Sequence, residues 1–150
     1  MSGVWQLDQP VYDASHVPTI VVCCSDGRFI EATQDFLRSQ GLGRHDLMAM
    51  PGGMAEALYE REVPGGALSG ARATELLAHL HHTKKVILLA HADCGYYHQR
   101  LGASVPDVQK KDLSRAADWL TEHIPNVKVD AYYMRPAQED EGAGFIVESV

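Results

Sequence analysis

The chain has 150 residues, a net charge of -7 and a hydrophobic content of 45%, as expected for one acidic globular domain with enough apolar side chains for a core. Its 13 basic residues are scattered, so nucleic acid and anionic membrane surfaces, which both require clustered positive charge, are not expected partners. No apolar run approaches the roughly 18 residues of a membrane span and no signal peptide is recognisable, so we expect a cytoplasmic protein.

Strand and helix patterns alternate after an extended N-terminal arm at residues 1–17. Short runs rich in β-branched and apolar residues predict strands that are buried on both faces. Longer segments with apolar residues at every third or fourth position predict helices. In chain order we expect a strand at 19–23, a helix at 30–40, a strand at 46–50, a helix at 66–82, a strand at 84–90, a helix at 107–123 and strands at 127–134 and 144–149.

This alternation predicts one α/β domain over residues 18–150, with a mostly parallel sheet of order 2-1-3-4 and helices on both faces. The last two strands are joined by the short acidic turn QEDEGAG, so the final strand is expected to be an antiparallel edge. The segment at 66–82 is the clearest helix. Its predicted apolar face consists of Ala73, Leu76, Leu77 and Leu80.

The three cysteines point to chemistry rather than to disulfide bonds. Two of them are adjacent, which makes a poor disulfide framework and is more typical of a metal ligand or a nucleophile. Cys24 follows the first strand, and His91 follows the strand at 84–90. Those two strands are neighbours in the predicted sheet, and open α/β sheets bind ligands where the strand order reverses. We therefore expect Cys24 and His91 to lie close together.

Cys24, His91 and Cys94 together form a typical zinc ligand set. Two thiolates and an imidazole leave the fourth position of the metal open, as in catalytic zinc sites. Cys94 is expected at the start of a helix, whose positive end favours a thiolate. Asp26 and Arg28 alternate with Cys24 along the chain, and an aspartate beside an arginine stays ionised. Such a carboxylate can accept a proton from a metal-bound water or bind the metal itself.

Two short motifs resemble those of one enzyme family. CSDGR, residues 24–28, resembles the Cys-x-Asp-x-Arg signature of the β-class carbonic anhydrases, and HADC, residues 91–94, resembles their His-x-x-Cys. The resemblance covers about residues 18–148. It implies zinc held by Cys24, His91 and Cys94, with Asp26 and Arg28 as a catalytic pair. It also implies interconversion of CO2 and bicarbonate through a zinc-bound hydroxide, in a homodimer or higher homo-oligomer.

The chain departs from this family after its second strand. The family usually has Arg-Asn-Ala-Gly where this chain has AMPGG at residues 49–53. With Met48, Met50 and Met54 nearby, one alternative is hydrolysis of a related heterocumulene, such as carbonyl sulfide or carbon disulfide. A second alternative is a non-catalytic zinc-binding module in which Asp26 permanently fills the fourth position. Gly52 and Gly53 are expected to form a tight turn that brings backbone near the metal, and they are weak candidates for binding substrate.

Other residues have simpler interpretations. Cys23 alternates with Cys24, so it is expected on the opposite face of the sheet as a buried thiol. His79 and His82 share a polar helix face and are more typical of solvated side chains than of metal ligands. His98 is a minor candidate as a ligand or a proton shuttle. Asp26 and Arg28 alone would be a plain ion pair, and their spacing from Cys24 favours a functional role.

Overall fold

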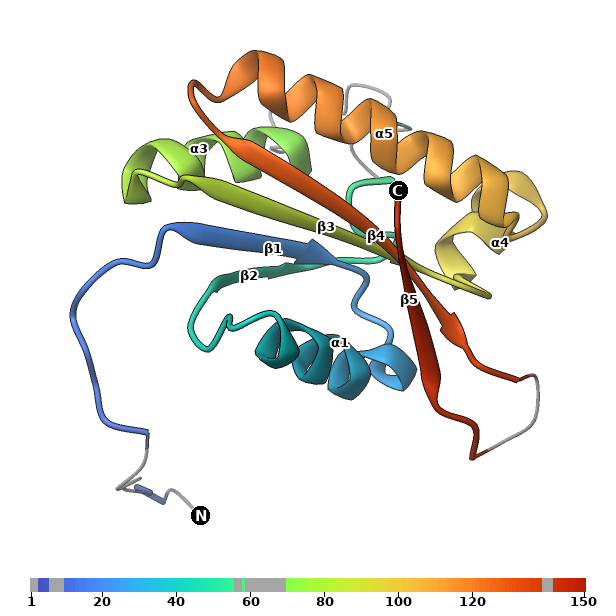
Figure 1. Cartoon of the computed structure of the whole chain (residues 1–150), viewed down its shortest axis with the longest axis horizontal. Coiled ribbons are helices and arrows are strands. Elements are labelled where there is room, and N and C mark those ends of the chain that lie inside the picture. Colours follow the sequence, from blue (N-terminus) through green and yellow to red (C-terminus); the bar gives the residue numbers. More distant parts are fainter. Residues whose placement is uncertain (1–2, 6–9, 56–57, 59–69, 139–141) are drawn as a thin grey trace.

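The computed structural model describes residues 3–5, 10–55, 58, 70–138 and 142–150. Its centre is a five-stranded sheet of order β2-β1-β3-β4-β5 (Figure 1). Strands β1 to β4 run parallel to one another, and β5 is antiparallel to β4. The strands are β1 (Thr19–Cys23), β2 (Asp46–Ala49), β3 (Lys85–His91), β4 (Lys128–Pro136) and β5 (Phe145–Ser149). The predicted strand order and the antiparallel edge strand are confirmed.

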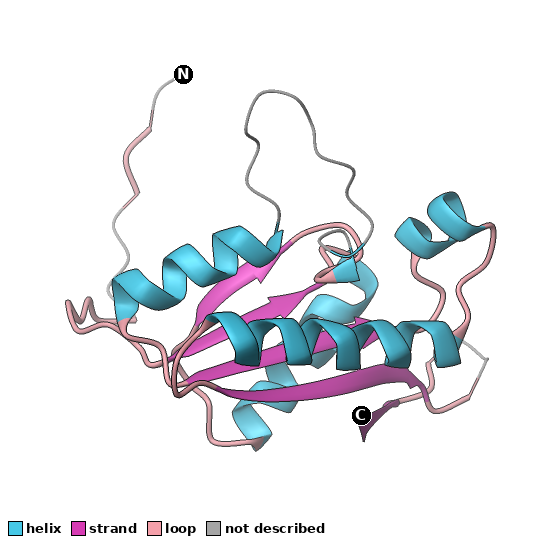
Figure 2. Ribbon diagram, turned by 90° about the horizontal axis from the view of Figure 1, so that it is seen from above, coloured by secondary structure: helices cyan, strands magenta, loops and turns pink. Residues whose placement is uncertain are grey.

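Helices cover both faces of this sheet. In the described residues they are α1 (Gly27–Ser39), α3 (Gly70–His81), α4 (Gly95–Leu101) and α5 (Pro106–His123). Figure 1 shows α1 on one face and α3 and α5 on the other, and Figure 2 shows α3 and α5 side by side over the strands. None of these helices is long and apolar enough to cross a membrane. Residues 66–69 of the helix predicted at 66–82 lie outside the described residues.

The start of α1 differs from the prediction, and the difference places two candidate site residues. The helix begins at Gly27 rather than at residue 30, because Asp26 caps its N-terminus. The Asp26 carboxylate accepts the backbone N–H of Arg28 at 3.0 Å, which satisfies one of the donors that a helix start leaves unpaired. Asp26 therefore has a fixed position directly after β1.

The pleat of β1 divides the core into two layers. Ile20 and Val22 pack in the apolar cluster on the side of α3 and α5, whereas Val21 and Cys23 pack with Leu37 on the side of α1. All of these side chains are buried, and the complete burial of one such aliphatic side chain stabilises the fold by about 1.5–3 kcal/mol. Burial also raises the pKa of Cys23 to about 11. The prediction that Cys23 is a buried thiol is confirmed.

The predicted apolar face of α3 was wrong for Leu76 and Leu80, whereas Leu77 packs against the core. Leu76 and Leu80 are 49% and 62% exposed, and the buried residues of this helix are Gly70, Ala71, Thr74 and Ala78. Small residues are required there because the helix approaches the sheet closely. A Cβ at Gly70 would lie 2.6 Å from the Met50 sulfur. The leucine spacing predicted a helix correctly, but spacing alone did not identify the buried side.

The described part of the N-terminal arm is extended and leads away from the sheet (Figure 1). Arg44 holds the arm by donating to the carbonyl oxygen of Ser15 at 2.7 Å and by pairing with Asp13. The ring of His16 stacks on His81 of α3 with 4.4 Å between ring centroids. Residues 1–2 and 6–9 of the predicted arm lie outside the described residues.

Candidate metal centre

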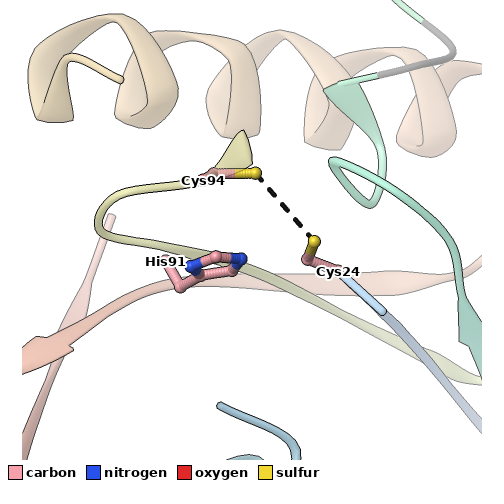
Figure 3. A group of neighbouring side chains, drawn as sticks. All are labelled: Cys24, His91 and Cys94. Carbon is pink, nitrogen blue, oxygen red and sulfur yellow. Dashed lines mark hydrogen bonds between the residues drawn. The ribbon is translucent and has the colours of Figure 1, made fainter. Parts of the chain in front are cut away.

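Three side chains from separate segments converge at the carboxyl edge of the sheet. Cys24 directly follows β1, His91 is the last residue of β3, and Cys94 precedes the first residue of α4. One ligand atom from each of these residues lies within 4.8 Å of the other two, and Figure 3 shows the three side chains around one space. The predicted proximity of Cys24 and His91 is confirmed, because β1 and β3 are paired in parallel.

The hydrogen bonds of His91 determine which ring nitrogen can bind a metal. Nδ1 lies 2.7 Å from the carbonyl oxygen of Ala92, and because a carbonyl oxygen only accepts, Nδ1 must carry the proton. In the neutral ring, the lone pair is then on Nε2. It is buried and has no hydrogen-bond partner among the described residues, although an unpaired buried polar atom costs about 1–3 kcal/mol. A metal ion between His91 and the two thiols would satisfy it.

The two thiols interact with each other. The sulfur atoms of Cys24 and Cys94 are 3.9 Å apart, a distance that Figure 3 marks with a dashed line. Hydrogen bonding from Cys94 lowers the pKa of Cys24, and the neighbouring His91 and the backbone N–H of Gly52 add to this effect. The pKa of Cys94 is raised, because its thiol donates to Cys24 and because it is buried. The pair thus favours one thiolate, and a metal ion can displace the second proton.

A glycine turn brings backbone against Cys24. Gly52 and Gly53 both have positive φ angles, +75° and +56°, which glycine adopts without strain. The N–H of Gly52 donates to the Cys24 sulfur at 3.3 Å. A Cβ at Gly53 would lie 3.2 Å from the carbonyl carbon of Cys23, and one at Gly52 would clash with Tyr96 at 2.6 Å. The turn therefore needs both glycines to reach the sulfur.

A second set of hydrogen bonds holds the segment between His91 and Cys94. Gln109 of α5 is completely buried and donates to the carbonyl oxygen of His91 at 2.7 Å. Ser104 accepts the backbone N–H of Cys94 at 3.0 Å and donates to the Gln109 side-chain oxygen at 3.1 Å. Such outer contacts orient metal ligands. Sequence reasoning missed Ser104 and Gln109, although a glutamine within the buried stripe of a helix is a usable signal.

Asp26 and Arg28 form a tight ion pair beside the ligands. Arg28 donates from Nε to both carboxylate oxygens at 3.1 Å and from Nη2 to Oδ2 at 2.6 Å. These hydrogen bonds lower the pKa of Asp26 to about 2, so the carboxylate is charged at neutral pH. Its Oδ2 lies 3.9 Å from His91 Nε2. The carboxylate thus faces the space between the candidate ligands while Arg28 holds it.

Arg28 has a further acidic partner that sequence reasoning did not identify. Asp93 accepts Arg28 Nη1 at 2.9 Å, and the other oxygen of its carboxylate accepts His98 Nε2 at 2.8 Å. His98 is therefore bound to a carboxylate in this structure and lies outside the ligand group. Asp93 stands between His91 and Cys94 in the sequence, so its proximity to the site could have been predicted. Its contact with Arg28 could not, because that contact depends on the backbone conformation of Asp93.

In the other histidine-rich stretch, His79 and His82 are exposed to solvent. In the described part of the chain, Cys24, His91 and Cys94 are the group that could hold a metal ion. His81 pairs with Asp46 of β2 at 2.7 Å, and His79 lies 4.0 Å from Glu75 one helical turn earlier.

Comparison with known proteins gives distant relatives. No protein-family model matches the chain. Uncharacterized proteins of Rickettsia conorii and Rickettsia bellii are each 26% identical to it in a 124-residue alignment, and the match covers 77% of this chain. The match spans 66% of the R. conorii protein and 75% of the R. bellii protein. These relatives carry no activity in their names, so they do not identify a function.

Solved structures identify the fold. The β-carbonic anhydrase isoform I of Trichomonas vaginalis superimposes with a TM-score of 0.57 and 12% identity, over 98% of this chain and 87% of that one. The β-carbonic anhydrase CafA of Aspergillus fumigatus gives a TM-score of 0.53 and 16% identity, over 91% and 76% of the two chains. The chain therefore has the fold of β-carbonic anhydrases, as the resemblance of its motifs predicted.

The ligand assignment can be tested with the two adjacent cysteines. Cys24→Ala should abolish stoichiometric metal binding, because it removes one of three soft ligands. Cys23→Ala is the matched control, since the same change on the opposite face of the sheet should leave about one metal per chain. Elemental analysis of dialysed, metal-loaded protein measures both. Equal metal content in the two variants would contradict the assignment of Cys24.

Proposed function

We propose that the chain binds one zinc ion through Cys24, His91 and Cys94 and catalyses the reversible hydration of CO2 to bicarbonate. One observation carries the proposal: the ionised Asp26, paired with Arg28, lies with its Oδ2 3.9 Å from His91 Nε2, which has no hydrogen-bond partner among the described residues. A charged carboxylate in this place can accept a hydrogen bond or a proton from a water at the fourth metal position. The fold shared with β-carbonic anhydrases supports the same function.

Each residue then has a defined task. Zinc, when bound, would act as a Lewis acid that makes hydroxide available near neutral pH. Asp26 accepts a hydrogen bond from the reacting water and so directs the lone pair of its oxygen toward CO2. Arg28 keeps the carboxylate charged and oriented, the role that outer residues have in metal sites. The reaction adds water to CO2, giving bicarbonate and one proton that leaves to solvent.

The glycine turn supports the site through Cys24. The Gly52 N–H donates to the Cys24 sulfur, and the Gly53 N–H donates to the carbonyl oxygen of Met50 at 2.8 Å. Both N–H groups are thus engaged within the protein, and we assign the turn to positioning Cys24. Contact between these glycines and substrate stays a prediction.

The methionines do not favour a sulfur-containing substrate. The Thr74 hydroxyl of α3 contacts the sulfur of Met48 at 3.2 Å and that of Met54 at 4.0 Å, and Met50 lies against Gly70. All three side chains pack beneath α3. Hydration of CO2 therefore remains the proposed reaction. The non-catalytic module, in which Asp26 fills the fourth metal position, is separated from it by the experiment below.

Arg28→Ala should reduce CO2 hydration by about tenfold to hundredfold while the protein keeps its zinc. The reason is that Asp26 loses the guanidinium that holds it, and it becomes free to turn toward the metal position. Stopped-flow CO2 hydration at pH 7 and pH 9, with zinc measured on the same samples, tests this. Arg38→Ala is the matched control, because Arg38 lies on the same helix and, within the described part of the chain, forms its ion pair with the exposed Asp35.

Two results would count against this account. An Arg28→Ala variant as active as the wild type would remove the pair from the mechanism. A wild type that is fully loaded with zinc but inactive at both pH values would select the non-catalytic module.

We also propose that the chain forms a homodimer or a larger homo-oligomer. Leu76 and Leu80 are exposed on α3, and Trp5 and Tyr12 of the arm are 84% and 89% exposed. Apolar side chains that gather on a surface are typical of protein interfaces. The cytoplasmic location expected from the sequence also remains a prediction.

Light scattering coupled to size-exclusion chromatography at micromolar concentration should give at least twice the mass of one chain. Leu76→Glu combined with Leu80→Glu should lower that mass, because a charge would be buried at the interface. A wild type with the mass of one chain would contradict the oligomer.

A further inference from the structure

We infer that Asp93 is a positioning residue that holds Arg28 on Asp26 and so keeps Asp26 away from the metal position. The inference rests on the proposed function, because it explains how the active arrangement of the pair is maintained. It concerns a residue between two candidate ligands that is not itself a ligand. Asp93 is 66% exposed at its side chain, so neither burial nor packing accounts for its contacts.

The guanidinium of Arg28 is held along two edges. Asp26 occupies the edge formed by Nε and Nη2, with contacts of 3.1 and 2.6 Å. Asp93 occupies the other edge, with its carboxylate on Nη1 at 2.9 Å and its carbonyl oxygen on Nη2 at 3.0 Å. The planar fork of arginine is suited to such paired contacts. With both edges bound, Arg28 cannot turn away from Asp26 without breaking contacts to two residues.

The backbone of Asp93 is shaped for this task. Its φ is +53°, in the left-handed region that residues other than glycine seldom adopt, although aspartate and asparagine tolerate it best. In this conformation the carboxylate and the carbonyl oxygen both reach the same guanidinium. The other carboxylate oxygen accepts His98 Nε2 of α4 at 2.8 Å. Asp93 is therefore fixed from a second side.

The consequence concerns the carboxylate of Asp26. Asp26 Oδ2 lies 3.9 Å from His91 Nε2, so a modest movement would bring it to the metal position. When Asp93 is present, Arg28 stays on Asp26 and the fourth position remains available to other ligands. When Asp93 is absent, Arg28 has one anchor fewer, and the balance shifts toward the arrangement in which Asp26 fills that position.

Asp93→Gly removes the carboxylate without straining the backbone, because glycine adopts a positive φ freely. The first measurement uses the metal-free protein, in which nitrogen-15 NMR reports rotation of the Arg28 Nη groups about their bonds to Cζ. Rotation should be about three- to tenfold faster in Asp93→Gly than in the wild type. Asp93→Asn, which tolerates the same backbone and keeps one acceptor, should restore part of the restriction. Unchanged rotation in Asp93→Gly would overturn the inference.

The second measurement uses cobalt-loaded protein and azide, which binds only where the fourth metal position is available. Asp93→Gly should weaken azide binding about three- to tenfold at full cobalt content, and Asp35→Ala, which breaks an exposed pair on α1, should not. In the Arg28→Ala background the same Asp93→Gly change should have no further effect. An equal loss in that background would show that Asp93 acts without Arg28 and would overturn the inference.

These readouts separate the inference from the proposed function. If the wild type lacks CO2 hydration but Asp93→Gly frees Arg28 and weakens azide binding, the proposed reaction fails and the positioning role stands. If the wild type hydrates CO2 and Asp93→Gly changes neither readout, the positioning role fails alone.

Discussion

The hydrogen bond from His91 Nδ1 to the carbonyl oxygen of Ala92 is the contact on which the chemistry of this site depends. In the neutral ring it leaves the lone pair on Nε2, and that nitrogen lies in a buried space shared with two thiols. A buried lone pair without a partner is unfavourable in a folded protein. A metal ion can supply the interaction that His91 Nε2 lacks among the described residues, whereas a further apolar contact cannot.

The fold supplies the remaining parts from distant segments. Parallel pairing of β1 and β3 brings the ends of both strands together, so Cys24 and His91 meet although helices and β2 separate them in sequence. The glycine turn after β2 delivers a backbone N–H to the Cys24 sulfur. From the other side, Gln109 of α5 holds the carbonyl oxygen of His91. The two strands, the glycine turn and α5 thus each help to position the candidate ligands.

The charge arrangement beside the ligands is equally constrained. Asp26 has two roles at once, since it caps α1 through the Arg28 N–H and binds the Arg28 guanidinium. The helix cap holds the Asp26 carboxylate at the start of α1, and the Arg28 guanidinium holds its orientation. A short segment between a strand and a helix is well suited to this, because the backbone there is ordered by both elements.

The sequence contained enough information for the sheet and the ligand group. Buried strands are recognisable as short β-branched runs, and residues such as Cys24 and His91 at the ends of neighbouring parallel strands must meet. The buried face of α3 was not predictable in this way, because Leu76 and Leu80 have helical spacing but smaller residues such as Gly70 and Ala78 are the buried ones. Asp93 was also missed, since its contact with Arg28 follows from a left-handed backbone conformation that no sequence pattern reports.

X-ray absorption spectroscopy of the zinc-loaded protein reports the atoms around the metal without reference to activity, and so tests whether Cys24, His91 and Cys94 bind it. Two sulfur ligands at about 2.3 Å and two nitrogen or oxygen ligands at about 2.0–2.2 Å are expected. The nitrogen contribution should show the outer-shell scattering of one imidazole ring, and the His91→Ala variant should no longer hold stoichiometric zinc. A zinc environment without sulfur, or one that is unchanged in His91→Ala, would contradict the account.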